Sequence, residues 1–141
     1  MRYWDSSALV PLIVEQEESP RASALLAEED HVVTWWGSRL ECWGALCRLE
    51  REGRMDGATF KSGAERLQLL AARWSTIGPS EDLRRHAERL LRIHPLRAAD
   101  ALQLAACHVA GEGSSVRPAF LSFDRRLSAI AEREGFEVGG Q

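Results

Sequence analysis

Residues 96–110 form a helix-like segment, Leu-Arg-Ala-Ala-Asp-Ala-Leu-Gln-Leu-Ala-Ala-Cys-His-Val-Ala, that carries a single acid, Asp100. Alanine and leucine favour helix, and a helix that is apolar on nearly every side is normally buried. Burying an ionised carboxylate costs several kcal/mol unless its charge is compensated. Either Arg97 or the dipole of the first helical turn compensates Asp100, or a cation from outside the segment does. A metal ion would need further carboxylates from elsewhere in the chain.

The length and composition predict one globular domain over residues 1–141, large enough to bury a real core. Hydrophobic residues make up 45% and charged residues 28%, which excludes a disordered chain. Neither a membrane span nor a signal peptide is recognised, so we expect a cytoplasmic protein without membrane contact. Cys42, Cys47 and Cys107 form no Cys-x-x-Cys pair, which favours reduced thiols over a disulfide or zinc site.

The charge balance excludes a protein that coats nucleic acid through bulk charge, because the formal net charge is −3. Lys61 is the only lysine, and the other 17 basic residues are arginines. Arginine binds phosphate and carboxylate in a bidentate manner, so local phosphate binding stays open. Solvated helix faces are the ordinary explanation for the same arginines.

Strand-like and helix-like segments alternate along the chain. Strands are expected at residues 2–4, 31–35, 74–77 and 119–122, with an edge strand at 136–138. Helices are expected after Asp5 to about residue 18 and at 19–28, 38–52, 57–73, 80–93, 96–110 and 124–133. This alternation predicts an α/β fold, with a parallel sheet covered by helices on both faces.

Four acids stand where helices are expected to begin, and each has an ordinary capping explanation. Asp5 and Asp124 occupy N-cap positions, Asp100 lies in a first turn, and Glu41 completes a capping box that begins at Ser38. Asp5 and Asp124 also follow strands, at the edge where parallel sheets form their ligand crevices. Four acids around one crevice would require cations, and oxygen ligands select Mg²⁺ or Mn²⁺ rather than zinc.

Four stretches that span nearly the whole chain carry these acids. They read Tyr-Trp-Asp-Ser-Ser-Ala-Leu-Val from Tyr3, Ser-Arg-Leu-Glu to Glu41, Leu-Arg-Ala-Ala-Asp-Ala-Leu-Gln-Leu-Ala around Asp100, and Phe-Leu-Ser-Phe-Asp-Arg-Arg-Leu around Asp124. Together they resemble the PIN-domain nucleases, most closely the VapC-type ribonuclease toxins of bacterial toxin–antitoxin pairs. The resemblance implies a PIN-like domain with about five parallel strands in the order 3-2-1-4-5. It also implies Mg²⁺-dependent hydrolysis of RNA phosphodiester bonds.

The resemblance further implies catalytic roles for Asp5, Glu41, Asp100 and Asp124. Asp5, Asp100 and Asp124 are the expected ligands of Mg²⁺ or Mn²⁺, whereas Glu41 either ligates, directly or through water, or orients the nucleophile.

Three further residues are expected to support the site or the substrate. Ser6 follows the first acid, and Ser122 stands two residues before the last, where the family often has threonine. Arg97 contacts a substrate phosphate or pairs with a nearby acid. The implied partners are RNA, a small antitoxin whose C-terminal segment covers the active-site groove, and a second copy in a homodimer.

Two other functions stay open on the sequence. An Asp-nucleophile phosphatase could use Asp5, but it would need a second Asp at position 7, which is Ser7, and a downstream lysine. A non-catalytic PIN-like module would bind RNA or protein without cutting, and the retained acids speak against it. Tryptophan is enriched at interfaces as well as in cores, so either location is open for Trp35, Trp36, Trp43 and Trp74. None of the four histidines is predicted to ligate a metal.

Overall fold

Five short strands pair in parallel, in the order β3-β2-β1-β4-β5, in the computed structural model, which describes residues 1–140. The strands are β1 (Arg2–Trp4), β2 (Val33–Trp35), β3 (Ser75–Ile77), β4 (Ala119–Leu121) and β5 (Val138–Gly139). This arrangement confirms the predicted α/β class and the strand order 3-2-1-4-5. Strands β2 and β5 begin two residues later than the predicted segments.

Seven helices connect the strands over residues 1–140. They are α1 (Ser6–Ile13), α2 (Ser19–Glu28), α3 (Ser38–Arg51), α4 (Gly57–Ala71), α5 (Glu81–Ile93), α6 (Ala98–Gly111) and α7 (Arg125–Arg133). The predicted starts are confirmed where a side chain caps the helix, because Asp5, Asp56, Ser80 and Asp124 each accept a hydrogen bond from a first-turn backbone N–H. Helix α1 ends at Ile13, earlier than predicted, because Val14 adopts extended backbone.

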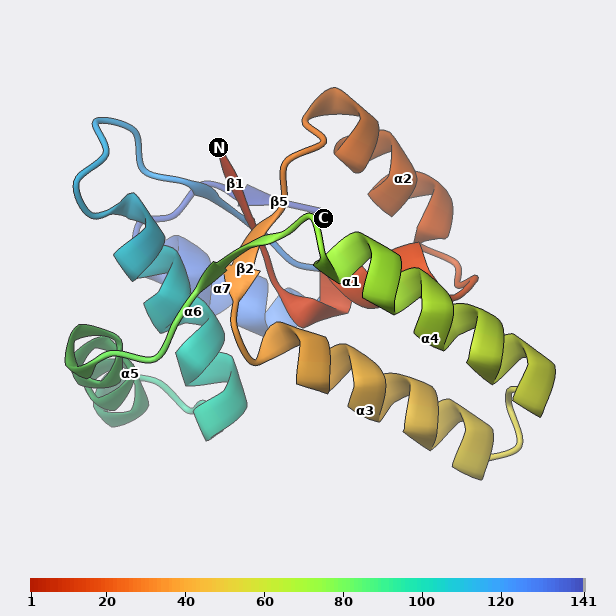
Figure 1. Ribbon diagram of the computed structural model, residues 1–141. Coiled ribbons are helices and arrows are strands. Elements are labelled where there is room, and N and C mark those ends of the chain that lie inside the picture. The colour runs from red at the N-terminus through yellow and green to blue at the C-terminus, as the bar shows by residue number, and fades with distance from the viewer. Residues whose placement is uncertain (141) are drawn as a thin grey trace.

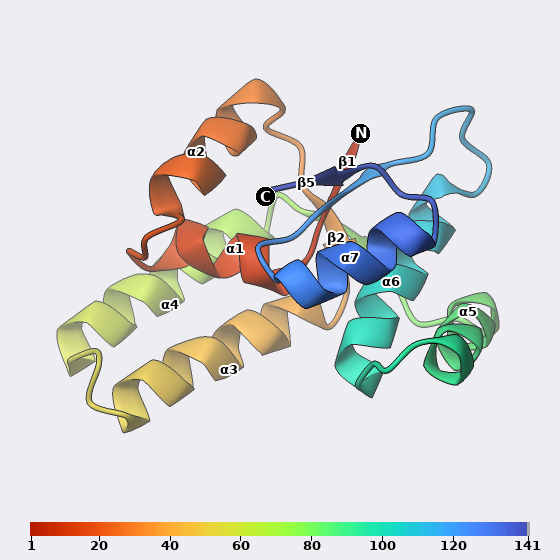
Figure 2. The same ribbon diagram turned by 180° about the vertical axis from the view of Figure 1, so that it is seen from behind.

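The helices cover the two faces of the sheet in two groups. Side chains alternate along each strand, so Tyr3 and Phe120 pack with helices α5, α6 and α7, whereas Trp4 and Leu121 pack with helices α1 to α4. The rings of Tyr3 and Phe120 stack with their centroids 5.7 Å apart. Figures 1 and 2 show α1 to α4 on one side of the sheet and α5 to α7 on the other. Each group closes one hydrophobic core.

Helix α6 is as deeply buried as its composition predicts. Ala101, Leu104 and Ala105 are fully buried in the core that α6 forms with α5 and the sheet. Its N-terminal turn, which carries Asp100, points toward the edge of the sheet where β1 and β4 end (Figure 1).

The three cysteines are unpaired, and the tryptophans divide between the cores and the surface. Cys42, Cys47 and Cys107 are free thiols, as predicted. Trp35 and Trp74 pack against the two cores, whereas Trp36 and Trp43 are exposed. No helix within residues 1–140 is both long and apolar enough to cross a membrane.

Candidate active site

Strands β1 and β4 end side by side, which brings Asp5 and Ser122 into contact. Trp4 pairs with Leu121, and the backbone N–H of Asp5 donates to Leu121 O at 2.9 Å. Beyond this pair, Ser122 Oγ donates to Asp5 Oδ2 at 2.9 Å and accepts a hydrogen bond from Asp124 N at 3.1 Å. Asp5 therefore lies at the carboxyl edge of the sheet, where ligand crevices of open parallel sheets form.

Asp5 is only 3% exposed, and serine hydroxyls hold its carboxylate. Ser7 Oγ donates to Asp5 Oδ2 at 2.6 Å, the same oxygen that Ser122 contacts. Burial raises the pKa of Asp5, and the hydrogen bonds from Ser7 and Ser122 partly oppose that rise. Ser7 was not among the predicted site residues, although a hydroxyl two residues after a capping Asp was the available signal. The hydroxyl of Ser7 orients the carboxylate of Asp5.

Glu41 lies in the first turns of α3, but the predicted capping box is wrong. The N-cap is Gly37, no side chain caps the helix, and Ser38 is its first residue. Ser38 is fully buried, and its Oγ accepts hydrogen bonds from Thr34 Oγ1 at 2.7 Å and Gln103 Nε2 at 3.0 Å. Those buried partners leave the Ser38 hydroxyl no capping role, so capping does not explain Glu41.

Gln103 holds Glu41 from the opposite side of the site. Its Nε2 donates to Glu41 Oε2, and its Oε1 accepts a hydrogen bond from Tyr3 Oη at 2.6 Å. Burial raises the pKa of Glu41, and the hydrogen bonds from Gln103 and Ser6 oppose that rise. Gln103 was not predicted, yet a buried polar residue one turn after Asp100 in an apolar helix was a usable signal.

Asp100 and Asp124 lie at the N-termini of α6 and α7. Burial and the negative charge of Asp124 raise the pKa of Asp100, and the nearby Arg126 and Arg97 do not outweigh them. Asp124 is exposed and caps α7 by accepting from Leu127 N at 3.0 Å. The sequence left three sources of compensation for the charge of Asp100: Arg97, the first helical turn or an outside cation. The first two therefore do not fully offset the cost of ionising Asp100.

Mutual repulsion links the four acids across four separate segments. The charges of Asp5 and Asp100 both raise the pKa of Glu41, just as Asp124 raises that of Asp100. Within residues 1–140 none of the four forms an ion pair. The structure thus brings Asp5, Glu41, Asp100 and Asp124 into one negative field, with Ser6 beside Glu41, Ser122 beside Asp5 and Arg97 near Asp100.

Comparison with known proteins assigns the fold to a family. The model of the PIN domain matches residues 2–133. The chain belongs to the PIN-domain family. It is similar to the ribonucleases VapC45 and VapC49 of Mycobacterium tuberculosis (strains CDC 1551 / Oshkosh and ATCC 25618 / H37Rv), each 31% identical over 139 residues. Those alignments cover 96% of this chain and 92% of each relative, so the resemblance found in the sequence is confirmed at the level of the family.

Two solved structures share the fold of this PIN domain. PAE2754 from Pyrobaculum aerophilum superposes with a TM-score of 0.63 at 19% identity, over 98% of this chain and 83% of that protein. A chain of a toxin–antitoxin complex from Klebsiella pneumoniae superposes with a TM-score of 0.60 at 15% identity, over 92% of both chains. At these identities the likeness concerns the fold alone.

The donor set of the PIN domain fits a hard divalent cation. The side chains at the crevice offer carboxylate and hydroxyl oxygens, the donors that Mg²⁺ and Mn²⁺ prefer. Burial raises the pKa of Asp5, Glu41 and Asp100, and neighbouring acids raise the pKa of Glu41 and Asp100 further, so a bound cation would favour the ionised forms of these carboxyls. Asp5, Asp100 and Asp124 stay the ligands predicted from the sequence, because within residues 1–140 the three ligand atoms that lie within 4.8 Å of one another belong to Asp82, His86 and Glu112 instead.

A second group of possible metal ligands lies far from this crevice. One ligand atom each of Asp82, His86 and Glu112 lies within 4.8 Å of the others. Glu112 follows α6, so it stands about 18 Å along the helix axis from Asp100 at 1.5 Å per residue. His86 Nε2 is only 2.8 Å from Glu112 Oε1. This histidine–carboxylate pairing accounts for the group without a metal.

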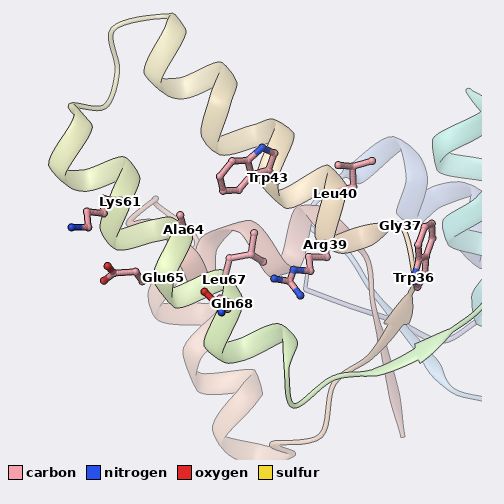
Figure 3. A pocket seen from close by; sticks show the side chains of 10 residues that line it. All are labelled: Trp36, Gly37, Arg39, Leu40, Trp43, Lys61, Ala64, Glu65, Leu67 and Gln68. Carbon is pink, nitrogen blue, oxygen red and sulfur yellow. The ribbon is translucent and has the colours of Figure 1, made fainter.

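An apolar pocket of about 640 Å³ opens between α3 and α4 (Figure 3). Trp36, Leu40 and Trp43 form its wall on the α3 side, and Leu67 contributes from α4. Trp36 is 64% exposed and Leu40 is 72% exposed. Leu40 directly precedes Glu41, but successive helix residues point in different directions, and none of the four acids lines this pocket. Large exposed apolar side chains gathered in this way are typical of a binding surface.

Proposed function

We propose that this PIN domain is a Mg²⁺-dependent endoribonuclease that acts as the toxin of a toxin–antitoxin pair. The single observation that carries the proposal is the gathering of Asp5, Glu41 and Asp100, whose carboxyl pKa values are all raised, without an ion pair inside residues 1–140. The named activity of the relatives from Mycobacterium tuberculosis, ribonuclease, supports the choice of RNA as substrate.

The proposed metal ligands are Asp5, Asp100 and Asp124, with Mn²⁺ as an alternative ion. A bound divalent ion would lower the pKa of a coordinated water and offset charge on the scissile phosphate. Ser7 and Ser122 hold Asp5 by donating to its Oδ2, so its carboxylate needs little reorganisation to bind. Deprotonation of these carboxylates is a condition for binding, because protonated ligands release the ion.

Glu41 is proposed to orient the nucleophilic water or to complete the ligand set. Gln103 donates to its Oε2, Tyr3 fixes Gln103 in turn, and the hydroxyl of Ser6 supports the carboxylate. This buried chain of hydrogen bonds keeps Glu41 in place while substrate and product exchange. Arg97, exposed near Asp100, is proposed to contact an RNA phosphate.

The proposed protein partners are a small antitoxin and a second copy of the chain. The antitoxin's C-terminal segment would cover the active-site groove, and the exposed apolar side chains of Trp36, Leu40 and Trp43 offer a surface on which a protein partner could pack. Aromatic side chains in such pockets supply much of the binding energy at protein interfaces.

RNA cleavage with a matched pair of variants tests the proposal. Wild-type protein should cut RNA with Mg²⁺ and stop when a chelator is added. Asp100→Asn should lose at least about a hundredfold in rate, because it removes a ligand and a charge at the metal. Asp82→Asn makes the same change of charge on α5 and should cut normally. Undiminished cutting by Asp100→Asn, or cutting that resists chelation, would rule the mechanism out.

Two further assays separate the alternatives. Turnover of a chromogenic phosphate ester without RNA cleavage would favour an Asp-nucleophile phosphatase, and absence of Mn²⁺ binding in a calorimetric titration would favour a non-catalytic module. Expression with and without the product of the adjacent gene tests the toxin role, with growth arrest expected only when that product is absent.

A further inference from the structure

A second, smaller pocket of about 360 Å³ adjoins the candidate active site between α1, α3 and the segment that joins β4 to α7. Ser7 and Asp124 line it, so it shares a wall with the acids. Val10, Leu49 and Phe123 supply apolar surface. A hollow of this size suits a small group such as one nucleotide rather than a peptide helix.

Arg48 is the cationic side chain among those that line this pocket. It follows Glu41 by seven residues, two turns along the same face of α3, which places it roughly 10 Å away along the helix axis. Arg48 is exposed, and in the described part of the chain it forms no ion pair. Its guanidinium therefore keeps its donors for a ligand.

The position of Arg48 in the last turn of α3 has an ordinary explanation too. A cation there interacts favourably with the helix dipole, and Arg51 occupies the same turn. Arg51 does not line the pocket. The dipole therefore accounts for both arginines equally, whereas only Arg48 borders the hollow beside Asp124. This difference makes Arg51 a matched control.

We infer that Arg48 binds an RNA phosphate that flanks the cleaved one, with Phe123 as the wall against which the adjoining nucleoside packs. The inference rests on the proposed ribonuclease function. The charge of Arg97 acts on Asp100, and Arg48 lines the pocket that Ser7 and Asp124 also line, so a bound strand would have one arginine near Asp100 and another in the pocket beside Asp124. Because the net charge of the chain is negative, such local arginines have to supply the affinity for phosphate.

Binding is measured by fluorescence anisotropy of a labelled single-stranded RNA over a series of salt concentrations, in an Asp100→Asn background that blocks cutting. Arg48→Gln should weaken binding about tenfold, the value of a charge-assisted hydrogen bond. It should also reduce the slope of log K against log salt by about 0.7, the contribution of one single-strand phosphate. Arg48→Lys should restore the slope and part of the affinity, and Arg51→Gln should change both quantities less.

Cleavage kinetics give a second readout, in which Arg48→Gln with Asp100 intact should raise KM far more than it lowers kcat. Glu18→Gln should act in the opposite direction and tighten binding, because Glu18 lines the same pocket and repels phosphate.

The outcomes separate the two claims. If the wild type cuts RNA but Arg48→Gln matches Arg51→Gln in affinity and slope, the subsite is refuted and the nuclease stands. If RNA binds with the expected dependence on Arg48 but is never cut, the proposed function fails, the role of Arg48 beside a cleaved phosphate is refuted with it, and only a contact between Arg48 and an RNA phosphate is left. If the wild type binds no RNA, both are refuted.

Discussion

Replacing Ser122 by alanine should make Asp5 markedly harder to ionise. Ser122 Oγ donates to Asp5 Oδ2 at 2.9 Å, inside a site where Asp5 is 3% exposed. A hydrogen bond to a charged group contributes about 1.5–3 kcal/mol. Since about 1.4 kcal/mol corresponds to a factor of ten, Ser122→Ala should favour the protonated form of Asp5 by at least about tenfold.

The titration of the Asp5 carboxyl is followed by carbon-13 NMR in the presence of a chelator, for wild type and Ser122→Ala. Burial already raises the pKa of Asp5, and the variant should raise it further. With Mg²⁺ present, the acidic limb of the pH profile of kcat/KM for RNA cleavage should move to higher pH in parallel.

Ser122→Thr is the matched control, because it keeps the hydroxyl at the same position. It should return the titration of Asp5 toward that of the wild type. An unchanged Asp5 titration in Ser122→Ala would refute the claim that this hydroxyl holds the carboxylate ionised. If the pKa of Asp5 rises equally in both variants, the effect comes from altered packing instead.

Three further outcomes follow from the same site. In chelator, Asp100→Asn should melt a few degrees higher than wild type and gain less from added Mg²⁺, because it removes a charge that Asp124 repels. Burial raises the pKa of Asp5, Glu41 and Asp100 above ordinary values of 3.8, 4.5 and 3.8, so the folded protein holds protons that the unfolded chain releases. Metal-free stability in urea should therefore fall as the pH rises above about 4, reaching its full loss above the raised pKa values. Tyr3→Phe should cost about 1–3 kcal/mol in urea unfolding, because Gln103 Oε1 loses a buried donor; a midpoint equal to wild type would show that water replaces it.

The helix starts were predictable where the capping contact is local. Asp56 and Ser80 each accept a hydrogen bond from the N–H three residues later, a contact that a short stretch of sequence encodes by itself. The α/β class was also predictable, because the strand-like and helix-like segments that alternate along the chain are each encoded by a short stretch of sequence. The order of the strands, by contrast, came from the resemblance to the PIN-domain nucleases and agrees with the pairing observed.

The hydrogen bonds that hold the acids were not predictable from local spacing. Ser38 reads as the first residue of a capping box, yet its hydroxyl is satisfied by Thr34 and by Gln103, which lies 65 residues further along the chain. The contact between Ser7 Oγ and Ser122 Oγ at 3.1 Å spans 115 residues. Such contacts exist only once the strands and helices are packed, so Ser7, Ser38 and Gln103 were missed as positioning groups, whereas Ser6 and Ser122 were expected only because of the resemblance to the PIN-domain nucleases.

The most direct test of the metal site is anomalous scattering from a crystal of the wild type soaked in Mn²⁺. The account predicts a peak bounded by carboxylate oxygens of Asp5, Asp100 and Asp124, with oxygen distances of about 2.0–2.3 Å, near those typical of Mg²⁺. A peak only at Asp82, His86 and Glu112, or no peak at the carboxyl edge of the sheet, would contradict it.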